Sequence, residues 1–272
     1  MDEVMLALAA VAFIWVATNA KGIPLSYTFQ LLPSVYRFIL PRVFRPNREL
    51  VRSSDETENG SSLLRHFTYA VPLLFQYYTT KSRVILADID INLHKSNSTF
   101  FTDADISRAT LLSTLLGKAL ADVGPATPVL ASVQSKFLHE IRPYQAYWVC
   151  SRILAWNDKS LYTVTYFLRE NMAQLPVEVD ILGGGPTAVL RHDKLKNGVL
   201  AVLVTKYVFK AGRKTVPPEK ILLRAGLLVE DDNNSHDNFD QDPWAGKREI
   251  WNESNIDVAI GHGLQYIRES MF

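Results

Sequence analysis

The hydrophobic residues of this chain change their spacing three times along its length. From Val4 to Ala20 they form an almost unbroken run, and between Leu25 and Val51 they are mixed with arginines. From Ile106 to Leu120 they recur at helical spacing, and beyond Gly124-Pro125 the spacing becomes that of strands. The pattern predicts two N-terminal segments that precede a main domain, which contains one long helix followed by a series of strands.

The predicted long helix is apolar on more than one side. Leu111 and Leu120 widen the stripe formed by Ile106, Ala109, Leu112, Leu115, Leu116 and Ala119, and Gly124-Pro125 ends it. A helix that is apolar nearly all round must be covered on several sides. We therefore expect a sheet to wrap around this helix.

The strands after the helix suit that role. In the segment from Val129 to Ile141, apolar odd positions alternate with polar even ones, as in a half-buried strand. Further strands are predicted at residues 147–156, 161–168 and 199–209, with at least one more within 67–87. The short turn at 157–160 favours an antiparallel hairpin. The fold class is therefore α+β, with an antiparallel sheet wrapped around a long central helix in the hotdog arrangement.

The N-terminal apolar run has about the minimum length for a membrane span, about 17 residues. Asp2 and Glu3 precede it and positive charges such as Lys21 follow it, whereas a cleaved signal peptide normally begins with basic residues. The positive-inside tendency then predicts a single-pass N-terminal anchor with the main domain in the cytosol, the endoplasmic reticulum being the expected membrane. A helix packed on the domain and a cleaved signal peptide remain alternatives.

The chain divides into four expected parts. Residues 1–24 form the anchor, and residues 25–62 form a segment that either lies at a membrane surface with its arginines near anionic headgroups or is an ordinary linker helix. The polar stretch at 53–62 marks its end. The main domain spans 63–228, and residues 229–272 comprise an acidic loop and a final helix.

Composition narrows the possible functions. A net charge of +1 argues against a nucleic-acid partner. The single cysteine, Cys150, excludes an internal disulfide framework and a multi-cysteine zinc site, and its apolar neighbours predict a buried packing residue. There is no G-x-S-x-G elbow, H-E-x-x-H sequence or phosphate-binding loop. No metal or cofactor is therefore expected.

Polar groups instead crowd together just before the long helix. Asp88, Asp90, His94 and Asn97 lie within ten residues, and such groups are costly to desolvate unless a site uses them. The helix that follows would direct free backbone N–H groups toward them. A carboxylate, an imidazole and a helix N-terminus at one point are suited to attack on a carbonyl.

The sequence D-x-D-x-x-x-H-x-x-N-S-x-F followed by D-x-x-R resembles the signature of hotdog-fold thioesterases of the 4-hydroxybenzoyl-CoA thioesterase type. The likeness is greatest to their eukaryotic, membrane-associated branch with its fungal members, and it extends over roughly residues 81–212. It includes the stretch at 137–143, F-L-H-E-I-R-P, and the turn at 154–157. Where the bacterial pattern has a glycine, an asparagine and a tyrosine, this chain has Leu93, Ser96 and Phe100.

The resemblance implies hydrolysis of an acyl thioester, carried by coenzyme A or by a carrier protein, in a homodimer. By this resemblance Asp90 is the catalytic carboxylate, acting as a general base or as a nucleophile, and His94 assists it. Asn97, Ser98 and Thr99 would bind the substrate, the thioester oxygen facing the helix N-terminus.

Two further carboxylates are reserve candidates. Asp88 is the alternative to Asp90, and its other expected role is to brace the loop. Asp105 has an i, i+3 ion pair with Arg108 as its default role. Similar fungal proteins suggest an accessory function in a biosynthetic pathway. A protein that binds acyl chains without hydrolysis, or that transfers the acyl group to another acceptor, is the alternative.

Overall fold

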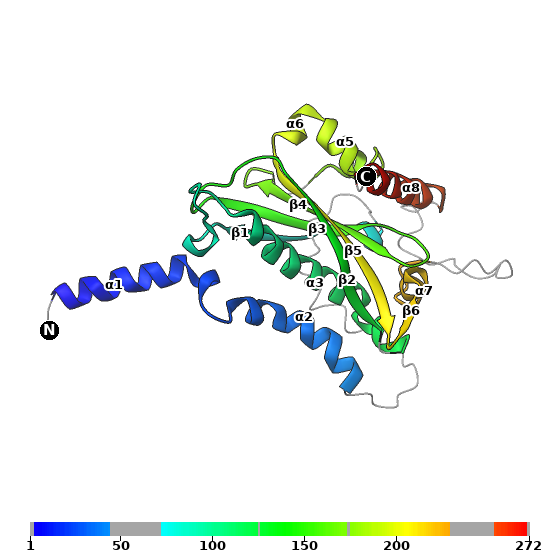
Figure 1. Cartoon of the computed structure of the whole chain (residues 1–272), viewed down its shortest axis with the longest axis horizontal. Coiled ribbons are helices and arrows are strands. Elements are labelled where there is room, and N and C mark those ends of the chain that lie inside the picture. Colours follow the sequence, from blue (N-terminus) through cyan, green and yellow to red (C-terminus); the bar gives the residue numbers. More distant parts are fainter. Residues whose placement is uncertain (1–2, 44–71, 125, 173–174, 229–252, 271–272) are drawn as a thin grey trace, which may run out of the picture.

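A computed structural model describes residues 3–43, 72–124, 126–172, 175–228 and 253–270. In this part of the chain one antiparallel sheet forms the centre of the molecule, with helices on both of its faces (Figure 1). Its strand order is β1-β3-β4-β5-β2, and β6 pairs with the end of β5. The strands are β1 (Tyr78–Arg83), β2 (Thr127–Phe137), β3 (Ala146–Trp156), β4 (Leu161–Arg169), β5 (Val199–Ala211) and β6 (Lys214–Val216).

The long helix α3 (Asn97–Asp122) packs on the inner face of this sheet, as its apolar pattern predicted. Its buried residues fall into two groups. Phe100 and Ala104 contact one end of the sheet, and Leu112, Leu116 and Leu120 contact the other. The prediction of a hotdog arrangement, with a sheet around a long helix, is confirmed.

Short helices cover the outer face of the sheet. They are α4 (Val177–Asp180), α5 (Pro186–Arg191), α6 (Asp193–Lys196) and the longer α8 (Glu253–Ser270), which confirms the predicted final helix. Because both faces are covered, β3 and β4 are buried almost throughout, and their sequences read as apolar runs. Helix α7 (Pro218–Arg224) begins at the second residue of Pro217-Pro218 and closes one end of the inner core.

Strand β2 differs from its prediction. It ends at Phe137, and Ile141 lies in the following loop, where it is fully buried. The pairing of β2 with β5 also shifts between Leu130 and Ser132, which interrupts the strict alternation expected from 129 to 141. β2 is an edge of the sheet, and Val129 and Leu130 on it are 44% exposed.

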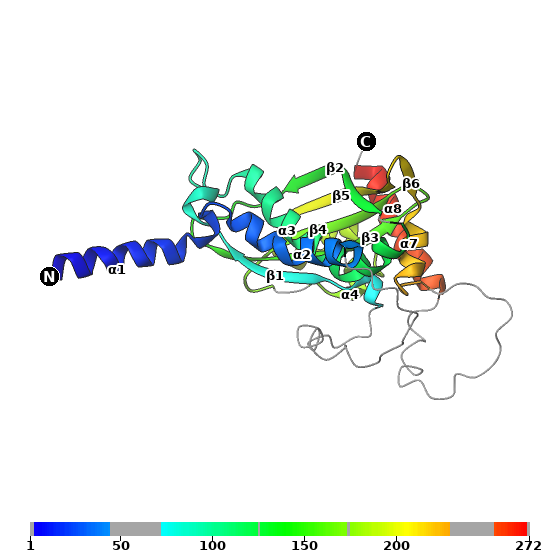
Figure 2. The same ribbon diagram turned by 90° about the horizontal axis from the view of Figure 1, so that it is seen from below.

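The first helix, α1 (Glu3–Thr18), extends away from the domain in both views (Figures 1 and 2), and all of its residues are exposed. Within the part of the chain that the structure describes, no helix combines the length and apolar character needed to cross a bilayer. The expected spanning anchor is therefore not found. The helix ends at Thr18 because Asn19, buried at 6% exposure, turns the chain into the 3-10 turn η1 (Ala20–Gly22).

The second helix, α2 (Ser26–Val43), continues through Pro33 and Pro41. It runs beside α3, and Ser34 and Arg37 form hydrogen bonds to Thr110 and Thr114 of that helix. Of the two possibilities for this segment, the structure supports a linker helix packed on the domain.

Two other expectations concern residues that are not described. The polar boundary at 53–62 and the acidic loop at 230–242 lie outside the described residues.

The single cysteine, Cys150, is buried as predicted, and desolvation raises the pKa of its thiol to about 12. Cys150 is therefore a packing residue rather than a nucleophile.

Candidate active site

The polar stretch before α3 forms a closed loop. A 3-10 turn, η4 (Leu86–Asp88), leads into it, and an isolated bridge between Ile89 and Lys95 closes it. Inside the loop the N–H of Asp90 donates to the carbonyl of His94 at 3.1 Å, and at its base Ser96 donates to the carbonyl of Asp88 at 2.7 Å. The backbone therefore brings Asp90 and His94 side by side at the start of α3.

The side chains of Asp90 and His94 face each other. The Nδ1 atom of His94 lies 3.6 Å from Oδ1 of Asp90. The His94 side chain is 22% exposed and the Asp90 side chain 27% exposed. The same Oδ1 accepts the backbone N–H of Asn92 at 2.9 Å, and His94 Nδ1 lies 3.3 Å from the carbonyl oxygen of Lys95. Both functional groups are thus oriented by the loop and still reachable by a ligand.

Leu93 occupies the position where the bacterial pattern has glycine. Its φ is +59°, in the left-handed region that favours glycine, and its side chain is 75% exposed. The loop therefore keeps the conformation that a glycine would adopt freely, at a steric cost of about 1–2 kcal/mol.

The proposed substrate-binding residues form the first turn of α3. Asn97 and Ser98 are exposed, while the Thr99 hydroxyl donates to the Ser96 carbonyl at 2.9 Å and accepts a hydrogen bond from Lys95. The first backbone N–H groups of a helix have no intrahelical acceptor, so this turn presents donors beside the loop. The Thr99 hydroxyl bonds to the protein, and the Ser98 hydroxyl lies 3.0 Å from that of Ser96, so the backbone N–H groups and the exposed Asn97 side chain are the groups most readily offered to a substrate.

Behind the loop lies a cluster of buried charges, which we call the ionic cluster: Lys21, Asp88, Lys95, Asp103 and Tyr147. Lys95 Nζ is 2.9 Å from Asp103 and 3.6 Å from Asp88, and Lys21 Nζ is 2.6 Å from Asp103 and 3.1 Å from Asp88. The Tyr147 hydroxyl donates to Asp103 at 2.5 Å. Two cations thus face two carboxylates, and the cluster is electrically balanced.

The environment of the cluster shifts several pKa values. Burial alone would raise the pKa of Asp103, but the facing ammonium groups of Lys95 and Lys21 outweigh it and lower that pKa below its ordinary value. Burial also lowers the pKa of Lys95, despite the opposing effect of Asp103. Burial and the Asp103 carboxylate raise the pKa of Tyr147, so its hydroxyl stays protonated and remains a donor.

The two reserve carboxylates have other partners. Asp88 belongs to the ionic cluster and accepts the backbone N–H of Ile85 at 3.3 Å, an arrangement that braces the loop. Asp105 forms the expected ion pair with Arg108 at 3.2 Å, and it also accepts the Tyr27 hydroxyl of α2 at 2.5 Å. Burial and that hydrogen bond raise the pKa of Tyr27 to about 12. Asp88 and Asp105 are therefore engaged in contacts that stabilise the loop and the α2–α3 packing.

Four members of the ionic cluster were not predicted from the sequence as site residues: Lys21, Lys95, Asp103 and Tyr147. Lys21 looked like a positive charge flanking a membrane helix, and Asp103 and Tyr147 lie in predicted apolar elements. Lys95 alone gave a local signal, because it is a cation directly next to His94 in an otherwise mixed polar loop.

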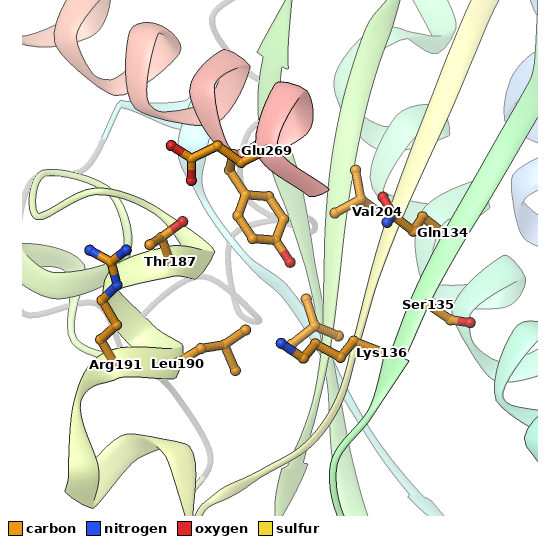
Figure 3. A pocket seen from close by; sticks show the side chains of 10 residues that line it. Gln134, Ser135, Lys136, Thr187, Leu190, Arg191, Val204 and Glu269 are labelled. Atoms are coloured by element: carbon orange, nitrogen blue, oxygen red, sulfur yellow. The ribbon is translucent and has the colours of Figure 1, made fainter. Parts of the chain in front are cut away.

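Hollows are lined by elements that contact the loop or the ionic cluster. A broad hollow of about 910 Å³ is lined by Arg169 and by the β2–β3 connection, including His139 and Arg142. The same connection is joined to the loop by a hydrogen bond from the Lys95 backbone N–H to the Ile141 carbonyl. A narrower cleft of about 360 Å³ lies between α2, β1 and α3 and reaches Asp103. A third hollow, of about 470 Å³ between β2, β5, α5 and α8, is shown in Figure 3 and contains none of the predicted site residues. Among the residues described, no His, Cys, Asp and Glu gather as a metal site would require.

Comparison with protein families agrees with this architecture. Residues 84–220 match the family model described as the thioesterase-like superfamily, which is half of the chain. The chain therefore belongs to that superfamily.

Several curated relatives are fungal proteins named as thioesterases or probable thioesterases. The chain is 34% identical over 206 residues to the thioesterase poxG of Penicillium oxalicum, which covers 71% of this chain and 65% of the relative. It is 34% identical to the probable thioesterase atnL of Emericella nidulans, covering 58% of this chain and 56% of atnL. The probable thioesterase YBR096W of Saccharomyces cerevisiae is 29% identical over 79% of both chains. The chain thus spans less than two thirds of poxG and atnL.

Solved structures include the probable thioesterase YbaW of Escherichia coli. It is 13% identical, covers 56% of this chain and 99% of its own, and gives a TM-score of 0.43.

Proposed function

We propose that this protein hydrolyses acyl thioesters at the loop that carries Asp90 and His94. The observation that supports this most directly is the half-buried but accessible Asp90–His94 pair, held by a closed loop at the N-terminus of α3 in a chain of the thioesterase-like superfamily. The similarity to poxG and atnL, both named as thioesterases, supports the same activity.

The geometry suits attack on a thioester carbonyl. Asp90 activates water as a general base or attacks directly, and His94 orients the water or the thioester. The first turn of α3 faces the carbonyl oxygen with backbone N–H groups, and Asn97 and Ser98 lie beside it; these donors stabilise the developing negative charge.

The substrate in this proposal is an acyl chain on coenzyme A or on a carrier protein. Arg142 and Arg169 line the broad hollow next to the loop and are suited to the phosphates of such a carrier. An accessory role in a biosynthetic pathway, which the similarity to fungal thioesterases suggests, belongs to the same proposal.

Two aspects of the assembly are also proposed. The exposed edge of β2, with Val129 and Leu130, supports a homodimer formed by pairing of edge strands. The exposed apolar helix α1 supports association with a membrane, with the domain on its cytosolic side at the endoplasmic reticulum. Flotation of the full chain with lipid vesicles, compared with a chain lacking residues 1–18, tests the membrane association.

The deciding experiment uses the full chain and a panel of acyl-CoA substrates. Replacing Asp90 by Asn should lower kcat by about a hundred- to ten-thousand-fold, the usual contribution of a general base, without changing the melting temperature. The matched control is Asp158→Asn, in the exposed β3–β4 turn. Activity of Asp90→Asn near that of the control would contradict the assignment.

The same panel separates the alternative. A protein that binds acyl-CoA without turnover, and binds equally well after Asp90→Asn, would be an acyl-binding protein. Product analysis with added alcohols or amines would detect acyl transfer instead of hydrolysis.

A further inference from the structure

The N-terminal segment contacts the turn before the proposed catalytic loop, and the ionic cluster behind that loop, through Asn19, Lys21 and Gly22. The side-chain Oδ1 of Asn19 accepts the backbone N–H of Leu86 at 3.0 Å, Lys21 enters the ionic cluster, and Gly22 lies directly on Ile85 and Ala87. We call residues 19–22 the strap. It crosses η4, the turn from which the loop begins.

The ionic cluster holds the loop at both ends. Asp88 lies two residues before Asp90, and Lys95 lies directly after His94. Lys95 contacts Asp103 of α3 directly. Asp88 is linked to Asp103 by Lys21, whose Nζ lies 3.1 Å from Asp88 and 2.6 Å from Asp103. Lys21 is therefore the only member of the cluster that comes from outside the main domain.

The charge balance makes Lys21 necessary to this arrangement. Without it, the buried carboxylates of Asp88 and Asp103 would share Lys95 alone, leaving one buried negative charge without a partner. The cluster then has to rearrange or admit water, and both ends of the loop depend on it. A displacement of about 1 Å at a catalytic group can cost about a hundredfold in rate.

We propose that Lys21 is a positioning residue, and that the strap holds the Asp90–His94 loop in its active geometry. The N-terminal segment is then part of the catalytic machinery rather than only a linker. This inference rests on the proposed function and adds a residue, and a segment, that act through the loop without touching the substrate.

The charge is tested with Lys21→Met and Lys21→Arg in the full chain. Lys21→Met should lower kcat at least about tenfold with little change in KM, because the substrate-binding groups stay in place. Lys21→Arg retains the cation and should recover most of kcat. The control Arg224→Met also removes a cation that pairs with an aspartate, but that partner is Asp122 at the far end of α3, so kcat should stay unchanged.

The position of the strap is tested separately with Gly22→Val. A Cβ atom there would lie 2.9 Å from Ile85 Cδ1 and 3.2 Å from Ala87 Cβ, so the larger branched side chain of valine forces the buried Ile85 side chain or the strap itself to shift at η4, while all charges remain. The expected result is again a loss of kcat.

Hydrogen exchange at the Lys95 and Ser96 amides gives a measurement that does not need activity. The Lys95 amide donates to the carbonyl of Ile141 at 2.9 Å and the Ser96 amide to that of Asp88 at 2.7 Å, and both hydrogen bonds hold the end of the loop. Lys21→Met should therefore accelerate their exchange and Arg224→Met should not. If the wild type hydrolyses no thioester, the proposed function fails, and this exchange still decides whether the strap holds the loop. Unchanged exchange, or a kcat of Lys21→Met within about twofold of the control, would overturn the proposal.

Discussion

A fully buried ion pair on the outer face of the sheet gives the sharpest stability prediction. Arg152 on β3 and Asp180 at the end of α4 are 2% and 0% exposed at their side chains, with Nε donating to Oδ2 at 2.6 Å. Tyr77 and Tyr166 also donate to Asp180, one to each carboxylate oxygen. Burial and the Asp180 carboxylate raise the pKa of both tyrosines well above its ordinary value, so both remain donors.

Replacing Asp180 by Ala removes the acceptor of all three groups. Breaking a buried pair by removing one partner costs about 3–5 kcal/mol, because the other charge stays buried without compensation. Two buried hydroxyls lose their acceptors at the same time, which adds to this cost. In a domain whose stability is about 5–15 kcal/mol, the loss is a large fraction of the total. With about 2–4 °C per kcal/mol for a domain of this size, the melting temperature should fall by about 10 °C.

Thermal unfolding of Asp180→Ala and of the exposed control Asp158→Ala measures the difference. The double variant Arg152→Met with Asp180→Leu removes both charges and should recover much of the loss, since well-packed apolar residues can replace a buried pair. Because the pair lies on the face of the sheet opposite α3, kcat per folded molecule should stay at the wild-type value. A melting temperature of Asp180→Ala within about 2 °C of the control would refute the reasoning.

Two further predictions concern the loop and the ionic cluster. Leu93→Gly should raise the stability by about 1 kcal/mol, because glycine adopts the positive φ freely and the exposed leucine side chain loses little packing; a lower melting temperature would contradict the strain argument. The pKa of Asp103 is lowered in the folded state, so the unfolded chain binds its proton first. The resulting stability is present above the ordinary pKa near 3.8 and is lost as the pH falls through the lowered value. In acid titrations followed by urea unfolding, Asp103→Asn should therefore show a shallower loss of stability below pH 4 than the wild type, and equal slopes would contradict the assignment.

Much of the fold follows from local patterns. The apolar helix that became α3, the strands β3 to β5, and the final helix α8 are visible as periodicities of 3.6 or as apolar runs bounded by turns. The loop with Asp90 and His94 is also local, since the bridged residues Ile89 and Lys95 are six positions apart and the hydrogen bonds of Asp90 and Leu93 lie within it. Such features depend on neighbours in the sequence, and the sequence alone therefore predicted them.

The tertiary structure decided what surrounds these elements. Lys21 joins Asp88 and Tyr147 across 67 and 126 positions of the chain, and no spacing in the sequence signals contacts of that range. The run that resembled a spanning helix ends at Thr18 because Asn19 is bound to the backbone of Leu86, a partner that only folding supplies. Burial of charge depends on which distant groups meet, and so the ionic cluster behind Asp90 could be found only in three dimensions.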